Sequence, residues 1–177
     1  MPIGRKGVAV GTVRTLVLEP EPLTEVAFAA FGWLPVDDTD PRDRDLTYEF
    51  AWGDTHVNLI SHAPDEVEHT ERGTVCAGMY RHDTHTQTLL PLNVESVLAV
   101  APAAVDFSDP ADLDTVRAFR LHPLEAFALA RGTWHWGPFP VGPEPVRMFN
   151  VQGKRYAEDN AFVDLAATAR AVFEVVT

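Results

Sequence analysis

The sequence predicts a mainly β fold in which short strands form a β-barrel or a jelly roll. Between about residues 46 and 150, apolar residues alternate with polar ones or gather in short β-branched runs, as in strands that bury one face. Proline, glycine and aspartate separate these runs, which is the pattern expected of turns. About eight short strands at this spacing are typical of closed or double-sheet β architectures.

The chain of 177 residues has a length that favours one domain. Residues 1–11 are glycine-rich and weakly patterned, so we expect a flexible tail there and a single domain over residues 12–177. An alternating, β-branched segment at 12–18 predicts a first strand. Thr24 is placed to cap a short helix that Gly32 ends.

The other elements follow from the periodicity of the apolar residues. The candidate strands are YEFAWG, HVNLISHA, TVCAGMYRH, QTLLPL, SVLAVAPAA, VRAFRLH, AFALARG and PVRMFNVQ. Residues 158–176 differ, because apolar side chains recur there at helical spacing, namely Phe162, Leu165, Ala169, Val172 and Phe173. We therefore expect a C-terminal amphipathic helix that caps the barrel.

The net charge and the cysteine content limit the classes of partner and of metal site that the protein can have. The net charge of −12 repels nucleic acid and anionic membrane surfaces, and no stretch approaches the ~20 apolar residues of a membrane span. The start of the chain lacks a convincing signal-peptide core, so we expect a cytoplasmic protein with no nucleic-acid or membrane partner. Cys76 is the one cysteine, which excludes an internal disulfide and a two-cysteine metal motif, and we expect it to be buried.

Two segments carry residues suited to chemistry. The first, YRHDTHTQ at 80–87, brings together two histidines, an aspartate and a glutamine, which fits a metal site, an acid–base site or a polar turn. On a strand, Tyr80 and His82 would share one face, and Arg81 would point the opposite way. His85 is expected at the turn that follows, where it is exposed or hydrogen-bonded.

The second segment, RGTWHWGP at 131–138, sets a histidine between two tryptophans. If this segment is extended, Arg131 and His135 share one face. The alternative is a packed aromatic corner around a hydrogen-bonded histidine. Trp134 would then belong to the core, and it could also form a wall of a pocket.

The spacing of the two segments resembles the motif pair of the cupin superfamily, H-x-H-x₄-E followed by G-x-x-H. With Gln87 at the glutamate position, His82 takes the second histidine and Tyr80 the first. Gly132 and His135 fit the second motif. The resemblance implies a cupin-like jelly-roll β-barrel.

Within that superfamily, the chain resembles the ureidoglycolate lyase family over about residues 14–152. The resemblance rests on R-H-x₄-Q-x₃-P from Arg81 to Pro91, on VRAF at 116–119 and on RGTWH at 131–135. It implies a homodimer that splits ureidoglycolate into glyoxylate and urea, late in purine and allantoin breakdown.

The chain departs from the family pattern at Tyr80, Trp136 and Gln152, where members commonly carry glutamate, histidine and aspartate. These departures leave two other functions open. One is a metal-dependent cupin enzyme, such as an oxygenase or isomerase, that acts on another small carboxylate. The other is a non-catalytic cupin that binds a small ligand.

The implied cleavage needs a base for the carbinol hydroxyl and an acid for the departing urea nitrogen. Histidine serves either role near neutral pH, so His82 and His135 are the expected catalytic pair, with Tyr80 as the next candidate. Gln87 can hold the urea amide through its donor and acceptor together. Trp134 or Trp136 is expected to form a wall of the substrate site, with Trp134 as the first candidate.

The substrate carboxylate needs a cation, and the planar fork of arginine matches it. Arg131 is the expected partner, and Arg147 is the weaker candidate. We expect either no required cofactor or one divalent ion (Mn, Fe, Ni or Zn), for which His82, His135 and Gln87 would be the ligands.

Overall fold

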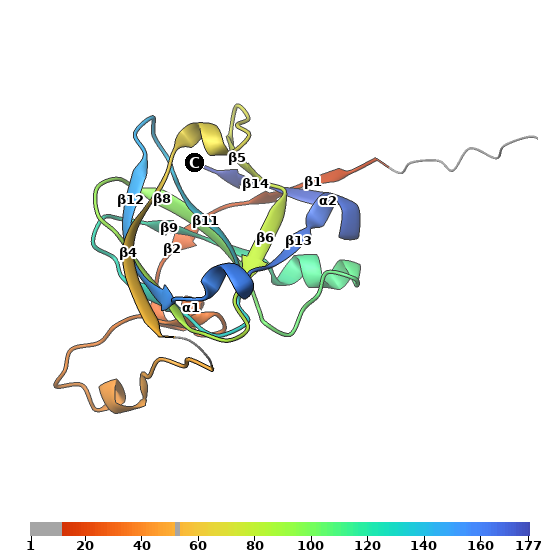
Figure 1. Cartoon of the computed structure of the whole chain (residues 1–177). Helices are drawn as coiled ribbons and strands as arrows, with labels where there is room; N and C mark the ends of the chain where they lie inside the picture. Colours follow the sequence, from red (N-terminus) through yellow and green to blue (C-terminus); the bar gives the residue numbers. More distant parts are fainter. Residues whose placement is uncertain (1–11, 52–53) are drawn as a thin grey trace, which may run out of the picture.

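The computed structural model describes residues 12–51 and 54–177, and most of its regular structure is β (Figure 1). Two sheets face each other. Across the first sheet the order is β3 (Gly32–Trp33), β10 (Phe127–Leu129), β7 (Gln87–Pro91), β12 (Val146–Gly153) and β4 (Thr55–His62). Across the second it is β13 (Ala161–Asp164), β6 (Gly78–Arg81), β11 (Trp134–Pro140), β8 (Ser96–Ala101), β9 (Arg117–Leu121) and β2 (Glu21–Pro22).

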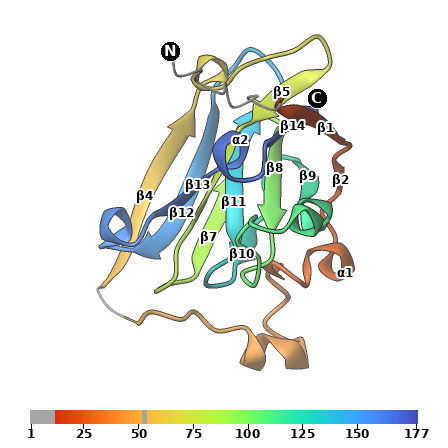
Figure 2. The same cartoon turned by 90° about the vertical axis from the view of Figure 1, so that its right-hand side faces the viewer.

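A third, smaller sheet lies at the top of both views in Figure 1 and Figure 2. It consists of β1 (Arg14–Leu18), β14 (Ala171–Val176) and β5 (Gly73–Cys76). Helical segments in the described chain are short: α1 (Glu25–Phe28), α2 (Leu165–Thr168), and 3₁₀ turns at Pro41–Asp45, Pro64–Glu66, Pro110–Thr115 and Tyr156–Glu158. No helix in the described ranges is long and apolar enough to cross a membrane.

The strand order confirms the predicted jelly roll. Without the short edge strands, the two facing sheets read β4–β12–β7–β10 and β6–β11–β8–β9, and every neighbouring pair in these two sets is antiparallel. Eight strands that alternate between two sheets in this order form the paired Greek keys of a jelly roll.

Two hydrophobic clusters hold the sheets together. The interior cluster joins the facing sheets, for example through Leu98 and Phe119 on one side and Leu89 and Met148 on the other. The outer cluster packs the second sheet against the third, where Val97 belongs to the same cluster as residues of β14. Strand β8 is therefore buried on both faces along its whole length, which explains its uninterrupted apolar sequence SVLAVA.

The predicted C-terminal helix is wrong. Residues 158–176 instead form β13, the single turn α2 and β14. Arg170 adopts a left-handed backbone (φ 52°) directly after α2, which ends the helix. The β-branched run that follows favours an extended strand, and β14 fills the space between β1 and β5 by pairing with both.

The predicted first strand and the helix cap at Thr24 are confirmed, and the expected tail at 1–11 lies outside the described residues. The helix ends at Phe28 and not at Gly32, where β3 begins. Strand β1 falls inside the predicted segment. Thr24 caps α1 by accepting a hydrogen bond from the Ala27 amide (3.3 Å). At Gly32 a Cβ would lie 1.8 Å from the Ala128 carbonyl oxygen, so only glycine permits this close pairing of β3 with β10.

The middle strands also match, with three differences. The predicted strand TVCAGMYRH is two strands, β5 in the third sheet and β6 in the second. The described part of YEFAWG forms no strand but an isolated bridge between Phe50 and His85. Strand β11 was not among the candidates, because its sequence contains Gly137 and two prolines. The pairing of β11 with β8 is irregular there, and its register shifts between Trp136 and Phe139, which is how the strand accommodates these residues.

Candidate functional site

Strand β6 delivers the first motif with the predicted alternation of faces. Arg81 points away from His82, because its guanidinium stacks over the Trp134 ring at 4.6 Å and pairs with the Asp83 carboxylate at 3.1 Å. Tyr80 faces a cavity together with His82, and its ring packs on Phe162 with 4.8 Å between ring centroids. The first motif therefore presents a phenol and an imidazole on one face.

Three histidines converge at the end of this strand, two from the loop between β6 and β7 and one from β11. The His82 ring stacks on His85 with 4.5 Å between centroids, and it lies 5.4 Å from the ring of His135 in β11. The Gly132 amide donates to the His82 carbonyl at 2.7 Å, which fixes the two motifs to each other. All three histidines are buried. Of the two alternatives expected for His85, exposure is therefore wrong, and its ring instead contacts polar groups of Thr84 and Asp159.

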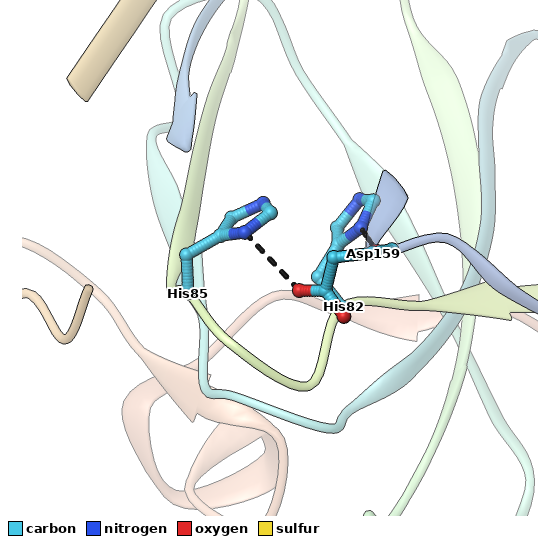
Figure 3. Close-up of side chains that lie close together, drawn as sticks. All are labelled: His82, His85 and Asp159. Carbon is cyan, nitrogen blue, oxygen red and sulfur yellow. Dashed lines mark hydrogen bonds and ion pairs between the residues drawn. The ribbon is translucent and has the colours of Figure 1, made fainter. Parts of the chain in front are cut away.

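Asp159 anchors two of these imidazoles (Figure 3). The backbone carbonyl of Asp159 lies 2.6 Å from His82 Nδ1, and its carboxylate lies 3.4 Å from His85 Nδ1. The same carboxylate accepts from the Asp83 amide (3.0 Å) and the Thr84 amide (2.7 Å). One residue that follows the 3₁₀ turn Tyr156–Glu158 thus fixes the loop between β6 and β7 and both of its histidines.

Backbone carbonyls fix the tautomers of His82 and His135, two of the histidines that line a neighbouring cavity. A carbonyl oxygen only accepts hydrogen bonds, so His82 Nδ1 carries the proton that it donates to Asp159. His135 Nδ1 faces the Thr133 carbonyl in the same way, at 3.2 Å. Each ring therefore keeps the lone pair on Nε2, which is the atom left for a substrate or a metal.

Burial keeps these imidazoles neutral. It lowers the pKa of His135 to about 3 and that of His85 to about 4. Burial also lowers the pKa of His82, although the bond to the Asp159 carbonyl opposes this. Burial alone would raise the pKa of Asp159, but the hydrogen bonds from Thr84 and Asp83 outweigh it and lower that pKa. At neutral pH the site thus holds neutral bases beside an ionised carboxylate.

A cavity of about 590 Å³ opens between the two facing sheets, and His82 and His135 form part of its wall. Its aromatic lining includes Trp136, Phe139 and Tyr156. The size is that of a typical small-molecule site, so both predicted catalytic histidines face a cavity large enough for a metabolite.

Amide side chains form the polar floor of this cavity. Gln87 Nε2 donates to Asn150 Oδ1 (2.9 Å) and to Gln152 Oε1 (3.3 Å), and Asn150 in turn donates to Asn58 (2.8 Å). Gln87 Oε1 is buried and has no partner. An unsatisfied buried acceptor in a cavity wall is suited to receive a ligand N–H.

Three residues that were predicted to contact the substrate, Arg131, Arg147 and Trp134, do not line the cavity. Residues 130–133 form a turn, so Arg131 does not share the face of His135, and its guanidinium binds the Asp83 carbonyl (2.9 and 3.1 Å) and Glu49 (3.0 Å). Arg147 lies on the exposed face of β12.

Trp134 also lies outside the cavity. Its indole packs against Phe107 in the outer cluster, with 5.8 Å between centroids, and donates to the Val105 carbonyl at 2.9 Å. Trp136, which stands where family members commonly carry histidine, is the tryptophan that lines the cavity.

A different set of residues from the predicted one could hold a metal. Within the described ranges, His82, His85 and Asp159 place ligand atoms within 4.8 Å of one another, whereas the expected set included His135 and Gln87. Two imidazoles and a carboxylate suit Zn, Fe or Mn, and the buried His85 Nε2 has no partner. The donor types therefore fit a divalent ion, and of the three only His82 lines the large cavity.

Sequence reasoning did not identify Asp159 as a site residue. It falls in the segment that was predicted to be helical, and no motif marks it. For His85, the signal is its position three residues after His82, but a place in a turn favoured exposure or a turn hydrogen bond over ligation.

Comparison with solved structures finds oxalate decarboxylase from Bacillus subtilis. Its structure at pH 4.6 has a TM-score of 0.40 and 15% identity, covering 82% of this chain and 29% of that chain. A deletion variant has a TM-score of 0.41 and 13% identity, covering 76% of this chain and 28% of that one. The chain thus spans less than a third of that enzyme's length.

No curated protein matches the sequence. A family model for ureidoglycolate lyase matches residues 36–170. That range covers well over half of the chain and includes both histidine motifs with the cavity they line. The chain therefore belongs to the ureidoglycolate lyase family.

Proposed function

We propose that this protein is a carbon–nitrogen lyase of ureide breakdown that splits ureidoglycolate, or a related α-hydroxyureide, into urea and an aldehyde of the glyoxylate type. The observation that carries the proposal is the pair of neutral imidazoles, His82 and His135, in the wall of one cavity with 5.4 Å between ring centroids. The family match supports the same reaction class.

The reaction needs one proton moved from oxygen to nitrogen. A neutral imidazole removes the proton of the carbinol hydroxyl, the carbon–oxygen bond becomes a carbonyl, and the carbon–nitrogen bond breaks with its electron pair leaving on the urea nitrogen. That nitrogen then takes a proton, so the step is balanced. His82 is the better base of the two, because the charges of Asp159 and Asp83 favour its protonated form, whereas the neighbouring histidines disfavour that of His135. His135 and Tyr80 are the partners for proton transfer.

The amide floor is suited to the leaving group. Urea offers N–H donors and a carbonyl acceptor, and the unpaired Gln87 Oε1 can accept from one of those N–H groups. Gln152 is already fixed against Gln87, so this receiving surface is held in place before a ligand binds. An ordered acceptor for the departing nitrogen lowers the entropic cost of reaching the transition state.

A divalent ion held by His82, His85 and Asp159 would supply a Lewis acid that polarises a substrate oxygen. The His82 lone pair would then be bound to the ion, and His135 would take the role of the base. The residues of the chain do the remaining work, which is to orient the ureide, exclude water and carry the proton. Homodimer formation and a cytoplasmic location stay predictions.

The test follows glyoxylate release from racemic ureidoglycolate, with and without prior chelation. We expect His82→Ala and His135→Ala to slow release about 10²-fold or more, the usual contribution of a general acid or base. His122→Ala is the matched control, because that side chain is exposed and pairs with Glu95 at the surface. Release no faster than in buffer with the wild-type protein, whether chelated or not, would refute the proposal.

The metal group favours a second candidate, a metal-dependent cupin enzyme acting on another small substrate. Tight stoichiometric metal together with oxygen uptake, and no urea release, would select it over the lyase.

A further inference from the structure

His62 is a further imidazole in the cavity wall, and it belongs neither to the two histidine motifs nor to the metal group. It is the last residue of β4, on the half-buried side of that strand. Its ring stacks on Phe139 with 4.9 Å between centroids, and its Nδ1 lies 2.8 Å from the Pro138 carbonyl oxygen. Both partners belong to β11, so this side chain links the two facing sheets where they border the cavity.

The contact with Pro138 decides which nitrogen of His62 is left for a ligand. A carbonyl oxygen only accepts hydrogen bonds, so Nδ1 carries a proton and donates it to Pro138. Nε2 has no hydrogen-bond partner among the described residues, where the histidines that form ion pairs are His85 and His122. The neutral ring therefore offers a lone pair at Nε2, and the protonated ring offers an N–H there.

The wall has no other obvious partner for an acid group. Among the described residues that line the cavity there is no arginine or lysine, and His82 and His135 are assigned to proton transfer. A protonated His62 can donate the charge-assisted hydrogen bond that a carboxylate accepts most strongly. Its second N–H is already satisfied by Pro138, so the ring would be held in place before the ligand binds.

The position of His62 suits the acid end of an α-hydroxyureide. Pro138 follows His135 by three residues in β11, which is about 10 Å of strand. The carboxylate of ureidoglycolate is bonded to the carbon that carries the hydroxyl, so a hydroxyl bound to His135 leaves the carboxylate within reach of His62. The amide floor lies toward the other end of the β4–β12 pair, where Gln152 is opposite His56.

We infer that His62, in its protonated form, binds the substrate carboxylate through Nε2 while the Pro138 carbonyl holds Nδ1. The inference rests on the proposed function for the identity of the ligand, and it adds a residue that selects the acid end. The Nε2 proton exists only on the charged ring. Binding of the anion therefore takes up a proton wherever the free ring is neutral.

Charged and titratable groups approach His62 from several elements, and none of the described ones forms an ion pair with it. On the neighbouring strand its direct partner is the uncharged Val146, and Arg147 lies on the exposed face. Asp65, in the 3₁₀ turn after β4, is exposed. The cavity wall contributes Glu66, Glu68, Tyr80, Tyr156, His82 and His135. Glu66 and Glu68 are exposed, and Glu66 accepts from the Ala63 amide at 2.8 Å.

Two unreactive analogues test the inference without turnover. Ureidoacetate and ureidoacetamide differ only in the acid end, and both lack the hydroxyl that cleavage requires. By calorimetry at pH 7, His62→Leu should weaken ureidoacetate binding about tenfold or more and change ureidoacetamide binding less than about threefold. The same result is expected in chelated and in metal-supplemented protein.

Three results would overturn the inference. Equal weakening of both analogues would mean that His62 only supports the fold of the wall. Unchanged ureidoacetate binding in His62→Leu would mean that the acid end binds elsewhere. A preference for ureidoacetate that disappears on chelation and is insensitive to His62→Leu would assign the acid end to a metal ion.

The link to protonation gives an independent measurement. Ureidoacetate affinity should fall as pH rises from about 6 to about 8.5, because the imidazolium loses its proton in this range, and calorimetry in two buffers of different ionisation enthalpy should detect proton uptake. His62→Arg should bind ureidoacetate with little dependence on pH, because arginine stays protonated. His122→Gln is the matched control, since that histidine is exposed and pairs with Glu95. The same pH dependence in His62→Arg as in wild type would contradict the inference.

Turnover separates this inference from the proposed function. If the wild-type protein cleaves ureidoglycolate, His62→Leu should raise KM about tenfold and leave kcat within about threefold, because the contact is made equally in the ground state and the transition state. Absence of urea release refutes the lyase proposal, and the analogue affinities still decide the role of His62. Cleavage with an unchanged KM in His62→Leu upholds the lyase and refutes the carboxylate contact.

Discussion

Replacing Asp159 with alanine should both destabilise the protein and slow the reaction. The carboxylate is the common acceptor for the Asp83 amide at 3.0 Å and the Thr84 amide at 2.7 Å, and it also contacts His85 at 3.4 Å. Alanine removes all of these acceptors and leaves the backbone carbonyl that faces His82. The change therefore loosens the loop between β6 and β7 without deleting a histidine.

The size of the effect follows from the bonds that are lost. A hydrogen bond to a charged group contributes about 1.5–3 kcal/mol. Asp83 is exposed and Thr84 half-buried, so water recovers part of that loss. We expect the free energy of unfolding to fall by about 2–4 kcal/mol, which corresponds to a melting temperature lower by roughly 5–15 °C for a chain of this size. Activity should fall about tenfold or more, as for other groups that orient a functional imidazole.

Urea denaturation followed by circular dichroism measures the stability, and glyoxylate release measures the activity. Glu158→Gln is the control at the neighbouring position. The Glu158 carboxylate lies at the surface, paired with Arg155 at 2.5 Å, so its loss should change stability and activity little. Asp159→Asn is the second variant. It keeps the shape of the side chain but replaces one carboxylate oxygen with an amide NH₂ group, which cannot accept the hydrogen bonds that Thr84 donates. If Asp159→Ala unfolds at the same urea concentration as Glu158→Gln, the anchoring role assigned to Asp159 is wrong.

Two further predictions concern the same site. His135 has a pKa of about 3 in the folded protein and near 6.5 in the unfolded chain. Between these two values the unfolded chain binds more protons than the folded one. The free energy of unfolding therefore falls as pH drops from about 6.5 toward 3, by up to ~1.4 kcal/mol per pH unit. Urea denaturation between pH 7.5 and pH 4 should show a shallower decline for His135→Gln, and an unchanged slope would contradict this. Gly153→Ala should cost about 1–3 kcal/mol and lower activity, because the new Cβ would lie 2.9 Å from His85 Nδ1. Gly142→Ala, which meets no atom within 4 Å, should leave both measurements near wild type.

The jelly roll could be predicted because the sequence pattern follows directly from the way each strand is buried. The predicted segment HVNLISHA became β4, where half-buried and exposed positions alternate along the strand. SVLAVA became β8, which is apolar throughout because sheets cover both of its faces. Strand β11 was missed because its glycine and prolines are turn signals when the bulge that accommodates them is not known.

The site was predicted only as far as motif spacing allowed. His82, His135 and Gln87 all line the cavity, because the motif spacing places them at the end of β6, in β11 and at the start of β7. Arg131 failed because the prediction assumed an extended segment, whereas Gly132 has a φ of +78° and turns the chain. A left-handed glycine cannot be told from an extended one in the sequence, and the turn decides where the neighbouring side chain points.

The error at the C-terminus and the omission of Asp159 have the same cause. Residues 158–176 have the apolar spacing of a helix, yet β14 is held by pairing with β1 and β5, which are more than 80 residues away along the chain. Such long-range pairing overrides local preference and is invisible to periodicity. Once this segment is extended, β13 pairs with β6, and that pairing brings Asp159 beside the loop that follows β6. Residues 158–176 therefore complete the sheets and position His82 and His85 through the same set of contacts. A prediction that makes this segment a helix misplaces its strands, and it misses Asp159 for the same reason.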